Sequence, residues 1–148
     1  MEWLIRLQNQ TVGLDTAPLI YFIEQNEIYL DLVRAFFQAM NQGEFRVVTS
    51  TLTLTEVLVH PIRAGNIKLA AQYREIISDQ ANLTALPVSF EIAETAAHIR
   101  ARHNLRTPDA IQIATAIRGR ASFFLTNDVR LVDVPDLEVL ALDNLLGE

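Results

Sequence analysis

The sequence contains no cysteine and only one lysine, Lys68. The missing cysteines exclude disulfide bonds, thiolate zinc sites and cysteine nucleophiles, so a bound metal must be held by oxygen atoms or by histidine. The three histidines, His60, His98 and His103, show no paired ligand spacing. Because oxygen ligands suit magnesium and manganese, the composition predicts Mg²⁺ or Mn²⁺ if a metal is bound.

Long apolar runs are also missing. None approaches the roughly 20 residues that cross a bilayer, and the N-terminal residues lack the apolar segment of a signal peptide. We therefore expect a cytoplasmic protein with no membrane contact. No stretch is rich in Gly, Ser or Pro, and the 148 residues are 50% hydrophobic, so we expect residues 1–148 to form a single domain.

Two nucleotide-binding patterns are missing as well. The first predicted strand is not followed by Gly-x-Gly-x-x-Gly, and Gly-x-x-x-x-Gly-Lys occurs nowhere in the chain. These absences disfavour dinucleotide binding and P-loop chemistry. A phosphoryl-acceptor receiver domain is also disfavoured, because it calls for an adjacent acidic pair after the first strand and a lysine at a late strand end. Lys68 lies instead in a predicted helix in the middle of the chain.

Basic residues are in deficit: 12 Lys and Arg oppose 18 Asp and Glu, which gives a net charge of −6. This balance argues against a protein that holds nucleic acid by bulk electrostatics. The objection weakens if several carboxylates surround a divalent cation, because the cation reverses the sign of the local charge.

Hydrophobic periodicity predicts short strands that alternate with helices. The predicted strands are 11–15, 46–49, 83–88, 122–126 and 137–142, and the predicted helices are 16–25, 30–40, 52–59, 67–81, 90–103 and 107–118. Pro61 and Gly65 separate the third helix from the fourth, and Pro87 restricts the third strand to an edge or a strand end. The pattern predicts a three-layer α/β/α, Rossmann-like fold with a mainly parallel sheet of four to five strands.

Three aspartates occupy positions that such a sheet brings together. Asp15 follows the first predicted strand, Asp128 follows the fourth, and Asp109 lies in a Thr-Pro-Asp helix start. Strand ends and helix N-termini share one edge of a parallel sheet, so these acids are expected to converge. Glu56, one or two turns into the helix after the second strand, is placed less securely. A divalent metal would offset their repulsion and activate water, which points to phosphodiester hydrolysis.

Each acid also has a purely structural explanation. Asp15 and Asp128 can cap helices, and Asp109 suits the first turn of a helix. Thr53 to Glu56 reads Thr-Leu-Thr-Glu, a capping box that would make Glu56 a partner of the backbone. Three aspartates at separate strand ends and helix starts are nevertheless more than capping requires.

The same residues carry a resemblance to a known family. Four stretches resemble, in order and at similar spacing, the motif blocks of the PIN-domain family, and of its VapC-type toxins in particular: VGLDTAPLIYFIE, TSTLTLTEVLVHP, LRTPDAIQIATAI and FFLTNDVRL. The acid of each block falls on Asp15, Glu56, Asp109 and Asp128, respectively. The resemblance covers nearly the whole chain.

The resemblance implies a Mg²⁺- or Mn²⁺-dependent endoribonuclease that is often a homodimer. A toxin member would form part of a type II toxin–antitoxin system and would be neutralised by an antitoxin protein. Asp15, Asp109 and Asp128 are then expected to ligate the first metal, with Glu56 completing the site or serving a second metal. The alternative is a PIN-like module that has lost useful catalysis and binds RNA or a protein partner.

Five further residues lie close in the sequence to Asp15, Asp109 or Asp128. Thr16 and Thr126 offer hydroxyls to a ligating carboxylate or a metal-bound water, although Thr16 also suits a helix start. Asn127 can orient Asp128, contact phosphate or simply form a turn. Arg106 and Arg130 can hold an RNA phosphate or remain solvated surface charges.

Overall fold

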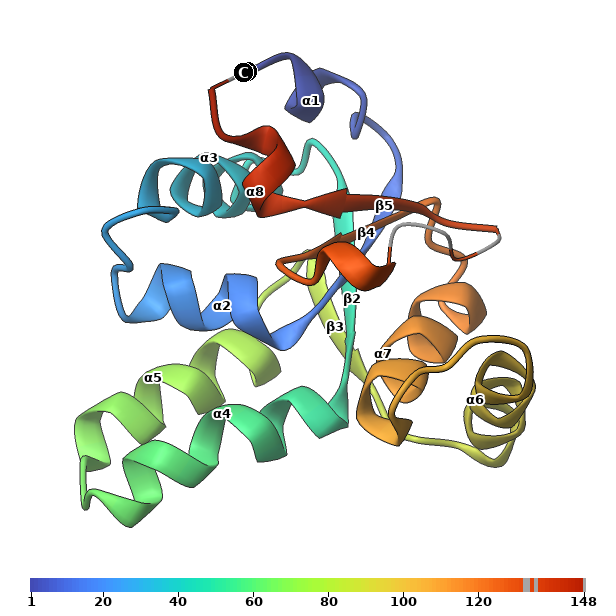
Figure 1. Cartoon of the computed structure of the whole chain (residues 1–148). Coiled ribbons are helices and arrows are strands. Elements are labelled where there is room, and N and C mark those ends of the chain that lie inside the picture. The colour runs from blue at the N-terminus through green and yellow to red at the C-terminus, as the bar shows by residue number, and fades with distance from the viewer. Residues whose placement is uncertain (132–133, 135, 148) are drawn as a thin grey trace.

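The computed structural model describes residues 1–131, 134 and 136–147 (Figure 1). Its elements, in chain order, are α1 (Glu2–Ile5), β1 (Thr11–Leu14), α2 (Thr16–Ile23), α3 (Leu30–Asn41), β2 (Arg46–Ser50), α4 (Thr51–Arg63), α5 (Ile67–Ser78), β3 (Leu83–Leu86), α6 (Phe90–Arg102), α7 (Thr107–Arg118), β4 (Phe123–Thr126), the 3-10 turn η1 (Val129–Leu131), β5 (Glu138–Ala141) and α8 (Leu142–Leu145). Among these residues, no helix has the length and apolar character needed to span a membrane.

The five strands form one sheet in the order β3-β2-β1-β4-β5, and every neighbouring pair is parallel. Val12 of β1 is in register with Val47 of β2 on one side and with Phe123 of β4 on the other. β3 lies at an edge, as Pro87 predicts, because proline cannot donate to a sheet. The parallel α/β prediction is therefore confirmed, and β1 lies at the centre.

Helices cover both faces of this sheet (Figure 1). α6 and α7 pack on one face through buried side chains such as Ile92, Ile113 and Phe124. The remaining helices belong to the opposite layer, where Phe36 and Tyr73 are fully buried. The predicted three-layer α/β/α arrangement is confirmed. Burial on both faces also explains why the strands are apolar runs with little alternation.

Several helices begin at polar residues whose side chains accept hydrogen bonds from backbone amides. Ser50 accepts from the amide of Leu52 at the start of α4, and Ser89 accepts from that of Ile92 at the start of α6. Because Ser50 caps α4, Thr53 lies inside the helix. The prediction of a capping box from Thr53 to Glu56 is therefore wrong. The Glu56 side chain does not cap the helix and is available for other contacts.

Pro61 does not end its helix, contrary to the sequence-based expectation. α4 continues to Arg63 and stops before Gly65, which has a φ of +67°. Proline removes one intrahelical hydrogen bond. Here it lies in the last turn and is buried, so packing retains the helix past it.

Candidate acidic site

All four predicted acids meet at the edge of the sheet where the strands end. Asp15 follows β1 and caps α2, Asp109 lies in the first turn of α7, and Asp128 follows β4. Glu56 reaches the same place from α4. Together they line an open hollow of about 550 Å³. The convergence expected from strand-end geometry is found in the structure.

Asp15 is the most deeply placed of these acids. One carboxylate oxygen accepts the backbone amide of Thr16 at 2.8 Å, and the other accepts the hydroxyl of Thr126 at 2.7 Å. Burial raises the pKa of Asp15, the two hydrogen bonds oppose that rise, and the nearby charges of Asp109 and Glu56 add to it. Three of the four acids thus share an electrostatic environment that disfavours a further negative charge.

Arginine side chains neutralise the outer part of the site. Arg130 pairs with both oxygens of Asp128, its Nε lying 2.8 and 3.1 Å from them, and lowers the pKa of that acid. The same guanidinium approaches Asp109 at 3.9 Å, and Arg106 lies 3.4 Å from Asp109. Both arginines are largely exposed, with 66% and 74% of their side-chain surface accessible. They can therefore swing away from the acids at little cost.

Glu56 is held by a polar network that enters the core. Thr16 donates its hydroxyl to Glu56 Oε1 at 2.7 Å, and Nε2 of Gln112 lies 3.4 Å from the same oxygen. Nε2 also lies 2.9 Å from the hydroxyl of Thr53, which pairs with Thr49 at 2.8 Å. Thr49 donates to the carbonyl of Leu14, directly before Asp15. The network connects Glu56 to the end of β1.

Sequence reasoning missed Gln112. Its residue is 3% exposed and lies among buried Ala110, Ile113 and Ala114 on α7. A polar side chain inside an otherwise apolar helix segment was the available signal, because buried amides require partners. Its Oε1 atom has no partner among the described residues.

We expect Gln112→Leu to lower the free energy of unfolding by about 1–3 kcal/mol, because the buried hydroxyl of Thr53 loses a donor. Denaturant unfolding measures the change. Gln72→Leu, at an exposed position of α5, is the matched control and should change stability by less than about 0.5 kcal/mol. Equal stabilities of Gln112→Leu and the unmodified protein would show that the network contributes nothing.

Asn127 contacts an aromatic residue and not the acid that follows it. Its Nδ2 donates to the hydroxyl of Tyr21 at 2.9 Å, while its Oδ1 is buried without a partner in the described part of the chain. Tyr21 lines the same hollow as the acids. The expectation that Asn127 orients Asp128 finds no direct contact to support it, and the aromatic contact was not anticipated.

The donor set suits a hard divalent cation, because every group is a carboxylate or hydroxyl oxygen. In the described residues, however, no three Asp, Glu or His side chains converge closely enough to hold one ion. Arg130 lies against both Asp128 and Asp109. The residues therefore fit a metal by their chemistry and by their shared hollow, although the acids of the described residues do not form a closed ligand set.

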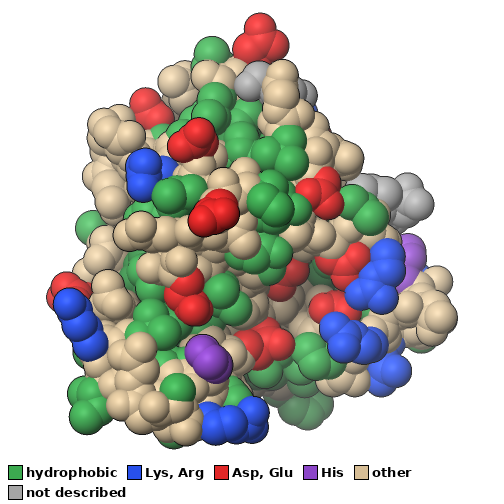
Figure 2. Space-filling view, turned by 60° about the vertical axis from the view of Figure 1, so that its left-hand side comes forward, with side chains coloured by type: hydrophobic (Ala, Val, Ile, Leu, Met, Phe, Trp, Pro, Cys, Tyr) green, Lys and Arg blue, Asp and Glu red, His purple; other side chains and the backbone are tan. Residues whose placement is uncertain are grey.

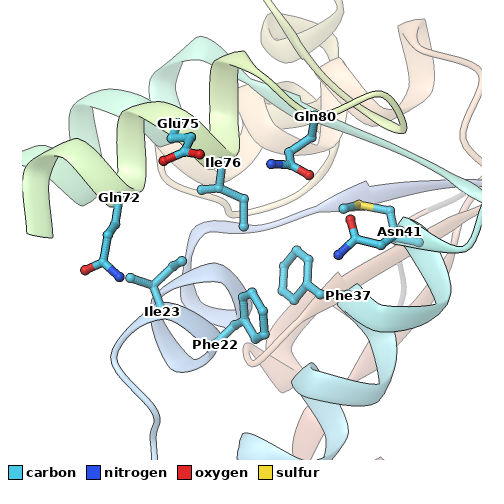
Figure 3. Close-up of a pocket in the computed structure, with 9 residues that line it drawn as sticks. Phe22, Ile23, Phe37, Asn41, Gln72, Glu75, Ile76 and Gln80 are labelled. Atoms are coloured by element: carbon cyan, nitrogen blue, oxygen red, sulfur yellow. The ribbon is translucent and has the colours of Figure 1, made fainter.

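A second hollow, of about 230 Å³, lies between α2, α3 and α5 (Figure 3). Phe22, Phe37 and Ile76 point into it, and amide side chains such as Gln72 and Gln80 stand at its margin. None of the four predicted acids lines it. Its lining combines apolar side chains with the polar side chains of Asn41, Gln72, Glu75 and Gln80.

Solved structures with the same fold include toxin–antitoxin proteins. VapBC2 from Rickettsia felis, bound to a promoter DNA fragment, is similar with a TM-score of 0.71 and 15% identity over 88% of this chain and 98% of that chain. A toxin–antitoxin complex from Klebsiella pneumoniae is similar with a TM-score of 0.66 and 20% identity, over 89% of this chain and 97% of that chain. VapC20 of Mycobacterium tuberculosis, described as a Sarcin-Ricin loop cleaving toxin, is similar with a TM-score of 0.63 and 15% identity. The match covers 77% of this chain and 86% of that chain. At these identities the likeness establishes the fold alone.

No curated protein sequence matches the chain. The sequence pattern of the PIN domain family, in contrast, matches residues 12–137. This range begins in β1 and ends after η1, so it contains Asp15, Glu56, Asp109 and Asp128. The match covers most of the chain, and the chain therefore belongs to the PIN-domain family.

Proposed function

We propose that this protein is a metal-dependent endoribonuclease whose metal is held by Asp15, Asp109, Asp128 and Glu56. The observation that carries the proposal is the gathering of these acids in one hollow, where burial first, and then the charges of Asp109 and Glu56, raise the pKa of Asp15. A fold tolerates such repulsion when a cation offsets it. Mg²⁺ or Mn²⁺ suits this oxygen donor set.

A cation held by these residues would supply a water of lowered pKa and would offset the charge of the phosphate. The role of the chain's own side chains is to hold and orient the carboxylates that would bind the cation. Thr126 fixes the carboxylate of Asp15, and Thr16 fixes that of Glu56. Arg106 and Arg130, once released from the acids, can contact RNA phosphates. In the hydrolysis the water oxygen bonds to phosphorus and loses a proton, the bond from phosphorus to the leaving ribose oxygen breaks, and that oxygen takes up a proton.

We further propose that the protein is the toxin of a type II toxin–antitoxin pair. The support is PIN-family membership together with the fold shared with toxin–antitoxin complexes from R. felis and K. pneumoniae. An antitoxin protein would then obstruct the acidic hollow. Homodimer formation is part of the same proposal and rests on the family resemblance.

A second function, a catalytically weak PIN module that binds RNA or protein, is favoured by one observation. Arg130 and Arg106 pair with Asp128 and Asp109, and no three acidic side chains of the described residues converge closely enough to hold an ion. The net charge of −6 adds to this argument. The two functions differ in whether added metal produces cleavage.

The test is cleavage of single-stranded and structured RNA with Mg²⁺ or Mn²⁺, followed by EDTA. We expect cleavage with metal, none with EDTA, and recovery when metal is returned. Attack by water requires no ribose 2′-hydroxyl, so a 2′-deoxy nucleotide at the cut should still permit cleavage, and the products should lack a 2′,3′-cyclic phosphate. Cleavage that persists in EDTA, or cyclic phosphate products, would contradict a metal-activated water. Absence of cleavage with either metal would favour the binding module.

A further inference from the structure

We propose that Tyr21, backed by Tyr29 and anchored by Asn127, is a stacking surface for one RNA base beside the cleaved phosphate. The proposal rests on the proposed ribonuclease function and adds a substrate subsite to it. Tyr21 lines the same hollow as the four acids, although it contributes no carboxylate. It lies on α2, the helix that Asp15 caps.

Contacts on two sides hold the Tyr21 ring in place. The ring of Tyr29 stacks on it with centroids 4.8 Å apart and planes 14° apart. Tyr29 in turn donates its hydroxyl to Asp143. The hydroxyl of Tyr21 accepts from Asn127 at 2.9 Å, and Asn127 lies between Thr126 and Asp128. A ring fixed in this way loses little conformational freedom when a ligand packs against it.

The lining of the hollow contains two chemically different kinds of residue. The acids and arginines supply charge, and Ala17, Ile20, Tyr21 and Val129 supply apolar or aromatic surface. Val129 is 49% exposed, which leaves apolar surface next to the acids. A nucleotide carries a charged phosphate and a flat apolar base within a short distance. The acids, with a bound cation, would suit the phosphate, and the Tyr21 ring suits the base.

The charge of the protein strengthens this inference. Figure 2 shows Lys and Arg side chains in small groups among acidic ones on the face in view, without a continuous basic surface. A net charge of −6 argues against RNA affinity that comes mainly from release of counterions. Stacking of a base on an aromatic ring contributes about 1–3 kcal/mol without using charge. Tyr21 supplies that kind of contact at the place where the substrate must bind.

The experiment measures KM and kcat for short single-stranded RNAs that each lack one base near the cut. For unmodified protein, removal of one particular base should raise KM by about 5- to 150-fold, with smaller effects at the other positions. Tyr21→Leu should raise KM for intact RNA by a similar factor and cause little further loss with that abasic RNA. Tyr21→Phe should retain most of the affinity, because the ring remains. Phe90→Leu, at an exposed residue outside the hollow, is the matched control.

Salt dependence separates stacking from charge. The slope of log affinity against log salt should be the same for Tyr21→Leu and for the unmodified protein, because stacking releases no counterion. The proposal is wrong if RNA is cleaved but no single abasic position raises KM, which would leave Tyr21 for another contact such as a protein side chain. The stacking proposal is also wrong if Tyr21→Leu raises KM by the same factor for every abasic RNA. If the unmodified protein cleaves no RNA, the result contradicts the proposed ribonuclease function, on which the stacking proposal rests.

Discussion

Asp15→Asn should reduce RNA cleavage by about a thousandfold or more while the protein stays folded. The substitution removes a proposed ligand charge, and metal ions contribute several kcal/mol of transition-state stabilisation, with about 1.4 kcal/mol corresponding to each tenfold in rate. The Asn side chain can keep a hydrogen bond to Thr16 and one to Thr126, the latter with its direction reversed. The Asn carbonyl can accept from Thr16, and its amide can donate to the Thr126 hydroxyl, which already accepts from the amide of Asp128. Single-turnover cleavage measures the rate.

Stability should move in the opposite direction from activity. Burial raises the pKa of Asp15 above its ordinary value, so the ionised carboxylate costs folding free energy in the metal-free protein. The stability from this group is present below its unfolded pKa and is lost as the pH rises through the folded pKa. Asparagine does not ionise. At neutral pH without metal, Asp15→Asn should therefore unfold at the same temperature as unmodified protein or at a higher one.

The matched control is Asp79→Asn. Asp79 is exposed at the end of α5, ahead of β3 and away from the carboxyl edge of the sheet. It should leave both cleavage and its metal dependence unchanged. Retention of full activity by Asp15→Asn, or loss of its fold, would contradict the role assigned to Asp15.

Gly13→Ala should destabilise the protein by about 1–3 kcal/mol and also impair cleavage. A Cβ at position 13 would lie 2.5 Å from Cβ of Ala116 and 2.8 Å from Cδ1 of Phe124. The close approach of α7 to β1 at Gly13 is what places Asp109 beside Asp15. Displacing α7 by about 1 Å would move a proposed ligand and cost about a hundredfold in rate. Denaturant unfolding and cleavage assays measure the two effects.

A second substitution distinguishes crowding from other causes. Ala116→Gly removes the closest atom, so Gly13→Ala combined with Ala116→Gly should be more stable than the sum of the single changes predicts. Ala116→Gly alone should cost about 1 kcal/mol as a glycine inside a helix. Additive losses in the double variant would show that the close approach is not the cause.

Much of the fold and of the site's location was predictable from sequence. The apolar strands 11–15 and 122–126 end at acids, and the Thr-Pro-Asp helix start places a third acid at the same edge. Parallel topology then brings Asp15, Asp109 and Asp128 together without further information. These are short-range signals, and each is read from a few neighbouring residues.

What was missed depends on contacts between distant segments. Gln112 reaches Glu56 across 56 positions, and Asn127 reaches Tyr21 across 106. No local pattern specifies such pairs, because the packing of α2, α4 and α7 fixes their distances. The capping box at Glu56 failed for a related reason, since Ser50 starts the helix one turn earlier than Thr53 would. Arg130 was placed near the site by sequence, but its pairing with Asp128 required the turn η1.

Calorimetric titration of Mn²⁺ into the protein at neutral pH tests the central claim most directly, because it detects the cation without requiring the right RNA. We predict binding to the unmodified protein and to Asp79→Asn, and a loss of affinity of at least about tenfold in Asp15→Asn, as expected when a ligating group is removed. Absence of binding by unmodified protein, or equal binding by all three, would contradict an acidic metal site at the end of β1.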